Sequence, residues 1–103
     1  MTFTLPELLD NLAERPAMHT GVASFETVRA FLSGLAAGLE FAGIKYTWED
    51  YLAAANARGW DPRGSIGIER DFREDNLTKE EMILELVAVE KAAYLRAANR
   101  DRQ

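Results

Sequence analysis

The stretch that decides the fold is residues 78–99, TKEEMILELVAVEKAAYLRAAN. Thr78 and Glu81 stand three apart, the spacing of a capping box in which two side chains satisfy free amides at a helix start. Apolar residues then recur at intervals of three and four, which places them on one face of a helix. This stripe consists of Met82, Leu86, Val89 and Ala93, widened by Ile83, Val87 and Tyr94. The pattern predicts a long helix from Thr78 to about Asn99 that buries a broad face.

Three further helix starts lie upstream, each marked by a Ser or Thr that can accept a hydrogen bond from a free amide. Thr4 opens the first helix, which runs to about Arg15, because Pro16 pushes the preceding residue out of the helical region. A second helix spans residues 24–42 and a third spans residues 47–59, each closed by a glycine. There is no hairpin pattern and no internal repeat. The sequence therefore predicts an all-α, single-domain bundle of four to five helices covering residues 1–103, with the last few residues frayed.

Residues 60–77 carry the weakest pattern in the chain. A turn is expected at residues 61–64, DPRG. From Ser65 onward the sequence fits a short helix, but Ile66 and Ile68 alternate around a glycine and also permit a short strand. A lone strand would have no partner, so the short helix is the favoured interpretation.

Two glycines and two tryptophans raise questions of packing. Gly34 and Gly38 stand four apart inside the second helix, at a cost of about 1 kcal/mol each relative to alanine. This spacing suggests that another helix crosses closely there. Trp48 lies on the apolar face of the third helix and is expected in the core. Trp60 either anchors a loop in the bundle or stands exposed as an interface residue.

The composition excludes several classes of function. The chain has no cysteine, which rules out disulfides, thiolate zinc sites and cysteine nucleophiles. Its net charge of -5 works against nucleic-acid binding, which depends on basic side chains. The first residues lack the pattern of a signal peptide, and no stretch approaches the roughly 18 apolar residues of a membrane span. We therefore expect a cytoplasmic protein that binds neither nucleic acid nor membrane.

The charge is unevenly distributed along the chain. Residues 65–90 hold eight acidic residues against three basic ones, whereas residues 91–103 are net basic. Acidic residues at a helix start and basic residues at its end both complement the helix dipole, which explains part of this asymmetry. The alternative is an acidic docking face for a basic partner. The residues of that face would be Glu69, Asp71, Glu74, Asp75, Glu80, Glu81 and Glu85, with Trp60 beside them.

The segment RPAMHTG, residues 15–21, holds the only histidine of the chain and connects the first two helices. It is interpreted first as a helix corner, with a binding site as the alternative. Met18 offers a flexible apolar plug, and Gly21 permits a positive φ angle. The residues singled out in this corner are Arg15, Pro16, Met18, His19 and Gly21.

The sequence offers little that points to catalysis. His19 has no second histidine or cysteine with which to bind a metal ion. The serines lack the glycine elbow that exposes a nucleophile. Glu40 lies among small and apolar residues, where it could line a pocket, but an exposed glutamate is the simpler interpretation. We expect no catalytic, cofactor-binding or metal-binding residues.

The corner RPAMHTG, the following Ser24 and the segment Phe31-Leu32-Ser33-Gly34 resemble a group of small, largely uncharacterised bacterial proteins. Members of that group carry an RP-x-MY-x-G corner, a serine and a helix with an FL-x-GY segment. His19 and Leu35 stand where those proteins often have tyrosine. The resemblance covers about residues 5–43. Some of these proteins look like immunity proteins encoded beside toxins, which implies a protein that neutralises its partner by binding it.

The leading hypothesis from the sequence is a non-catalytic protein-binding module of the immunity or antitoxin kind, which blocks a basic partner through its acidic face. The first alternative is a self-associating accessory subunit that uses apolar residues on the second or last helix. The second alternative is a small helical ligand binder or enzyme that uses Glu40, His19 or Tyr46.

Overall fold

The computed structural model describes residues 4–17, 24–64 and 67–101. Five helices lie in full within these ranges, and the described residues contain no strand. The helices are α1 (Leu5–Glu14), α3 (Phe25–Phe41), α4 (Trp48–Ala57), α5 (Ile68–Glu74) and α6 (Lys79–Asp101). The predicted all-α bundle is confirmed. No described helix combines the length and the apolar character needed to cross a lipid bilayer.

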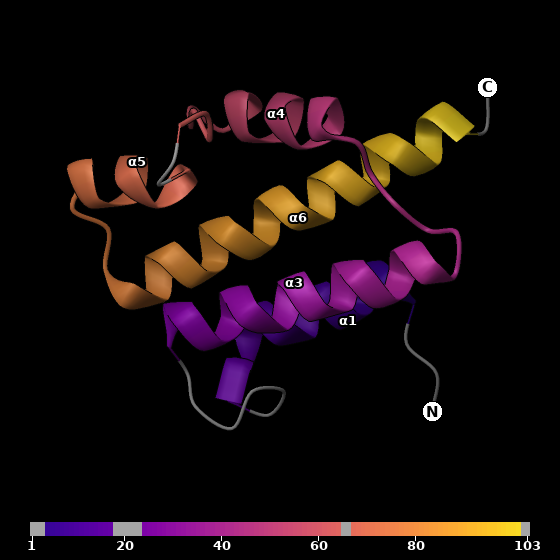
Figure 1. The fold of residues 1–103 in the computed structure, drawn as a ribbon. Coiled ribbons are helices and arrows are strands. Elements are labelled where there is room, and N and C mark those ends of the chain that lie inside the picture. Colours follow the sequence, from indigo (N-terminus) through magenta and orange to yellow (C-terminus); the bar gives the residue numbers. More distant parts are fainter. Residues whose placement is uncertain (1–3, 18–23, 65–66, 102–103) are drawn as a thin grey trace.

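The long helix α6 runs through the middle of the bundle (Figure 1). Helices α4 and α5 lie on one side of α6, and α1 and α3 lie on the other. Helices α1, α3 and α4 all pack against α6. The predicted stripe explains this position, because all of its residues except the partly buried Met82 are buried, namely Ile83, Leu86, Val87, Val89, Ala93 and Tyr94. Helix α6 is therefore the element on which the core is assembled.

The helix starts form as their sequences predict. The Thr78 amide donates to Glu81 Oε1 at 2.9 Å, and the Glu81 amide donates to Thr78 Oγ1 at 3.1 Å. The same reciprocal box joins Thr47 to Asp50 at the start of α4. At the start of α3, Ser24 forms its box with a threonine instead of an acid. Each box satisfies two amides that the helix itself leaves free.

Asp50 also ties α4 to the far end of α6. Its side chain is buried, and its oxygens lie 3.3 Å from Arg96 Nε and 2.5 Å from Arg100 Nη1. Burial acts to raise the pKa of Asp50, but hydrogen bonds from Thr47 and Arg100 outweigh it and hold the pKa below 3.8. One carboxylate thus caps a helix and joins it to its neighbour.

The segment between α4 and α6 folds around Trp60. The Trp60 ring meets the buried Phe72 edge-on, with ring centroids 5.1 Å apart, and its Nε1 donates to Glu85 Oε1 at 2.9 Å. Trp60 is partly buried against the core, so it anchors its loop. The predicted short helix exists as α5, which begins at Ile68. Residues 65–66, where the sequence also permitted a strand, lie outside the described residues.

Two packing predictions are wrong. A Cβ atom built on Gly34 or Gly38 would meet nothing within 4 Å, so none of the described helices crosses α3 closely there. Both glycines lie on the exposed side of α3, where glycine only lowers helix stability. Trp48 is 55% exposed instead of lying in the core. It stands at the first position of α4, directly after the Thr47 cap.

Candidate binding cleft

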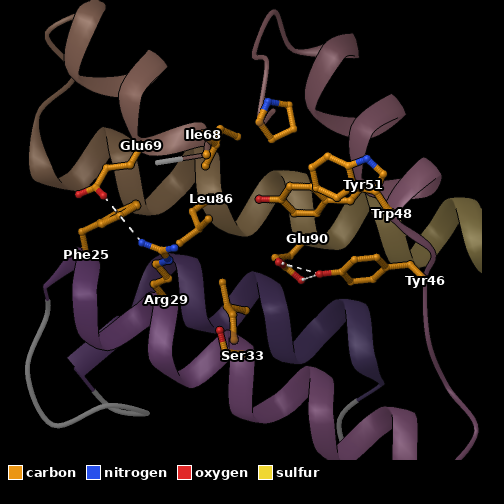
Figure 2. A pocket seen from close by; sticks show the side chains of 13 residues that line it. Phe25, Arg29, Ser33, Tyr46, Trp48, Tyr51, Ile68, Glu69, Leu86 and Glu90 are labelled. Atoms are coloured by element: carbon orange, nitrogen blue, oxygen red, sulfur yellow. Dashed lines mark hydrogen bonds and ion pairs between the residues drawn. The ribbon is translucent and has the colours of Figure 1, made fainter. Parts of the chain in front are cut away.

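A cleft of about 300 Å³ opens between α3, α4 and α5, with α6 at its base. Figure 2 shows its side chains pointing inward from all four helices. Helix α3 contributes Phe25, Arg29 and Ser33, and the turn into α4 contributes Tyr46. The deepest charged group comes from α6. That group is the carboxylate of Glu90.

Glu90 is buried, with 8% of its surface exposed. The Tyr46 hydroxyl lies 2.9 Å from Glu90 Oε1 and 2.8 Å from Oε2, so a single donor is shared by both oxygens (Figure 2). Among the described residues, no basic side chain pairs with Glu90. Burial raises the pKa of Glu90 to about 7, although the hydrogen bond from Tyr46 acts to lower it. This carboxylate therefore changes its charge near neutral pH.

Three aromatic rings form one wall of the cleft. Tyr46 and Tyr51 are stacked with ring centroids 5.8 Å apart, and Tyr51 and Trp48 are stacked at 5.9 Å. Tyr94 meets Tyr46 edge-on from behind, at 4.8 Å. Burial and the charge of Glu90 raise the pKa values of Tyr51 and Tyr94 to about 12, so both hydroxyls keep their protons at neutral pH. The wall is uncharged and ends at the exposed Trp48.

An ion pair lies at the opposite side of the cleft. Arg29 Nη1 on α3 is 3.8 Å from Glu69 Oε2 on α5, as Figure 2 shows. Glu69 Oε1 also accepts a hydrogen bond of 2.9 Å from Arg73. Arg29 and Arg73 thus neutralise Glu69, so its negative charge is not available to a cationic ligand. Glu90 remains the carboxylate of the cleft without a basic partner among the described residues.

The structure separates the acidic residues that the sequence grouped into one face. Glu69, Asp71 and Glu85 are used inside the fold. Asp71 accepts a hydrogen bond from the Asp61 amide. Glu85 accepts two hydrogen bonds from Arg58, at 2.9 and 2.6 Å, in addition to the one from Trp60. These three carboxylates stabilise the 58–71 region and do not point to a partner.

Four acidic residues remain exposed where α5 ends and α6 begins: Glu74, Asp75, Glu80 and Glu81. We call this group the acidic corner. Glu81 belongs to the capping box of α6, and Glu80 lies 4.0 Å from Lys79 Nζ. The acidic corner is therefore smaller than the predicted face and lies at one end of the molecule.

The RPAMHTG segment lies only partly within the described residues. Arg15 caps α1, which ends at Glu14 as the following proline predicts. Met18, His19 and Gly21 lie outside the described residues. Glu40, the other residue considered for a pocket, is exposed and lies 4.0 Å from Lys45 Nζ.

Sequence reasoning singled out Tyr46 but missed Glu90 as a site residue. The sequence does contain a pattern that indicates burial of Glu90, because this residue lies four residues from both Leu86 and Tyr94 on the apolar stripe of α6. A carboxylate on a buried stripe is rare unless it is paired. The partners that define the cleft come from α3, α4 and α5, and their positions depend on tertiary packing.

No group of three or more potential metal-ligating side chains occurs within the described ranges. No protein-family model matches the chain, and no significant match was found among curated proteins or solved structures.

Proposed function

We propose that the protein is a non-catalytic binding module that docks onto a basic protein partner through the face that carries the cleft. The observation that supports this proposal is the buried Glu90 carboxylate, which lies at the base of an open cleft without a basic partner among the described residues. A buried charge of this kind is costly unless it is paired. A cationic group inserted by a partner would supply that pairing.

The chemistry of the cleft favours binding over catalysis. One common catalytic arrangement of carboxylates is a pair in which one group acts as acid and the other as base. Here Glu69 is neutralised by Arg29 and Arg73. Both oxygens of Glu90 accept from Tyr46. The groups that remain are aromatic and apolar surfaces, which suit recognition.

The rim of the cleft has the character of an interface. Trp48 is more than half exposed beside the cleft, and tryptophan is enriched among residues that dominate binding energy. The acidic corner and the net charge of -5 would attract a basic partner from a distance and accelerate its association. A module of this kind would act by covering a functional surface of its partner, as immunity proteins and antitoxins do.

The test is affinity capture from the native host at low and high salt, followed by identification of the captured protein and measurement of its stoichiometry. The proposal expects a basic protein bound in a fixed ratio and released by salt. Trp48→Ala should abolish capture, whereas Phe41→Ala, which also removes an exposed aromatic ring, should not. Absence of a stoichiometric partner at low salt would overturn the proposal.

The contribution of the acidic corner can be measured separately. Glu74→Lys with Glu80→Lys should slow association and weaken its salt dependence, because long-range attraction acts mainly on the association rate. Glu14→Lys with Glu26→Lys makes the same change in net charge at exposed positions elsewhere. Equal association rates for the two double variants would show that the acidic corner makes no specific contribution to association.

A second candidate function is self-association through α6. Leu84 and Leu95 on this helix are 49% and 43% exposed. They lie with Ala88 and Ala92 on the part of α6 left open between α1 and α4. A stripe of this kind can receive a second helix. Sedimentation would show a dimer in the wild type that Leu84→Glu dissociates, and a monomer at every concentration would exclude this candidate.

A further inference from the structure

We infer that the cleft is a receptor for the side chain of a lysine, whose ammonium group pairs with Glu90 while its carbon stem packs along the apolar wall. The inference rests on the proposed function, because it names the group of the partner that enters the cleft. It is argued from the charge, the hydrogen-bond geometry and the ring arrangement at this site.

The charged groups that line the cleft favour a cationic ligand at Glu90. The charged groups that face the cleft are Arg29, Glu69 and Glu90. Arg29 lies 3.8 Å from Glu69 across the opening, and Glu69 also accepts from Arg73, which does not line the cleft. The tyrosines that surround Glu90 are uncharged at neutral pH, since burial raises the pKa of each. When Glu90 is ionised, the three charged groups that line the cleft carry one positive and two negative charges, and no basic side chain among the described residues contacts Glu90 itself.

The position of the Tyr46 hydroxyl selects an ammonium over a guanidinium. An arginine pairs best with a carboxylate through two parallel hydrogen bonds, one to each oxygen. In this cleft the Tyr46 hydroxyl sits between the two Glu90 oxygens, at 2.9 and 2.8 Å, and occupies that position. A lysine ammonium is a compact charge that needs only one free lone pair. Lysine can therefore pair with Glu90 without displacing Tyr46.

The arrangement of the aromatic rings argues against a methylated ammonium. Sites for quaternary ammonium groups surround the cation with ring faces. Here the interplanar angles are 20° between Tyr46 and Tyr51 and 22° between Tyr51 and Trp48. Rings stacked in parallel cover one another's faces and form a wall, not a cage. The wall can pack against a carbon stem, but it cannot enclose a trimethylammonium group.

The shape of the cleft fits a single long side chain. Its volume of about 300 Å³ lies at the small end of the range for ligand sites. Phe25, Leu32, Ile68 and Leu86 provide apolar lining between the opening and Glu90. A lysine side chain has the same layout, with an apolar stem and a charged end.

A proton competes with the lysine for Glu90. Burial holds the pKa of Glu90 at about 7, so the carboxylate is mostly protonated at pH 6 and mostly ionised at pH 8. Binding of the ammonium requires the ionised form. Affinity should therefore rise from pH 6 to pH 8 and then level off, as long as the lysine remains protonated.

The test uses small probes and the whole protein, with NMR chemical shifts as the readout. The lysine probe is N-acetyl-lysine N-methylamide, and the controls are the arginine and norleucine analogues. We expect shifts confined to the cleft with the lysine probe at roughly millimolar concentration. The arginine probe should bind clearly more weakly. The norleucine probe should cause no shifts, which would show that the apolar stem alone does not bind. Equal binding of the three probes would overturn the inference.

Two variants make the assignment specific. Glu90→Gln keeps the size and an acceptor for Tyr46, and it should weaken the lysine probe about tenfold and abolish the pH dependence. Glu40→Gln removes an exposed carboxylate elsewhere on the molecule and should change nothing. Unchanged binding by the Glu90→Gln protein, checked for folding by its NMR spectrum, would refute the pairing with Glu90.

Tyr46→Phe tests the basis of selectivity. Removal of the hydroxyl frees the edge of Glu90 that accepts two parallel hydrogen bonds, so the preference for the lysine over the arginine probe should fall several-fold. A preference that stays the same would contradict the role of Tyr46. Failure of all probes while a stoichiometric partner is still captured would overturn the lysine assignment and leave the binding function intact.

Discussion

Glu90 occupies a position that the periodicity of α6 assigns to an apolar side chain, and it is surrounded by tyrosines instead of by arginines. The free energy cost of burying Glu90 depends on pH. The protonated form is easily buried, whereas the ionised form loses its hydration. The residue therefore destabilises the free protein at the same pH at which the cleft is prepared for a cation.

This cost is the basis of a first prediction at the residue scale. The pKa of Glu90 is about 7 in the folded protein against 4.5 in the unfolded chain, so the folded state holds the proton more tightly. Its contribution to stability is fully present below about pH 4.5 and is lost as the pH rises through 7. Glu90→Gln should therefore gain stability over the wild type between pH 5 and pH 8, on the order of 2–3 kcal/mol. Urea unfolding at both pH values measures the difference, and a constant difference would contradict the prediction.

The glycines of α3 give a second prediction at this scale. Gly34 and Gly38 have open space where a Cβ atom would lie, and both have helical backbone. Alanine at each position should raise the free energy of unfolding by about 1 kcal/mol. Gly43 serves as the matched control, because its φ angle of +86° is unfavourable for any residue with a side chain. Thermal unfolding should show a higher Tm for the first two variants and a lower Tm for Gly43→Ala.

At the scale of elements, the helix starts were the most predictable feature, because a cap depends on residues only three apart. The ends marked by Gly43 and Gly59 were predictable for the same local reason, and both adopt positive φ angles. The prediction about Gly34 and Gly38 was wrong because a glycine pair does not reveal which side of its helix faces a neighbour. The prediction that Trp48 lies in the core was wrong for a similar reason, since the periodicity of a helix says little about its first turn.

The prediction at this scale concerns Asp50. Asp50→Ala removes the cap of α4 and leaves Arg96 and Arg100 without their shared carboxylate, so it should destabilise the protein by about 2–4 kcal/mol. Glu49→Ala removes the neighbouring exposed acid and should change stability by less than about 0.5 kcal/mol. Urea unfolding of both variants provides the comparison. Similar losses would show that charge in the first turn of α4, and not the link to α6, stabilises the helix.

At the scale of the whole molecule, the sequence predicts the class of fold but not the cleft. Local patterns place Tyr46 before α4 and Glu90 within α6, yet these residues are 44 positions apart and meet only through packing. The sequence also could not show which residues of the predicted acidic face have partners within the fold. Glu85 accepts hydrogen bonds from Arg58, at the end of α4, and from Trp60, in the segment that the sequence left uncertain.

Two phenylalanines test the packing of the whole bundle. Phe72 is fully buried against Phe25 and Trp60, whereas Phe41 is 97% exposed. Phe72→Ala should cost about 3–5 kcal/mol, and the same change at Phe41 should cost less than about 0.5 kcal/mol. Differential scanning calorimetry measures both. A large loss at Phe41 would place it in a contact, for example with a second copy of the chain.

The central position of α6 has a consequence for synthesis on the ribosome. Helices α1, α3 and α4 precede α6 in the chain, yet they pack against it. Leu12 and Val89 are 77 positions apart, so at ~5–20 residues per second roughly 4–15 s pass between their additions to the chain. During that interval the apolar faces of α1 and α3 are exposed to chaperones. A ribosome stalled before α6 would therefore hold an unfolded chain, however complete its other helices.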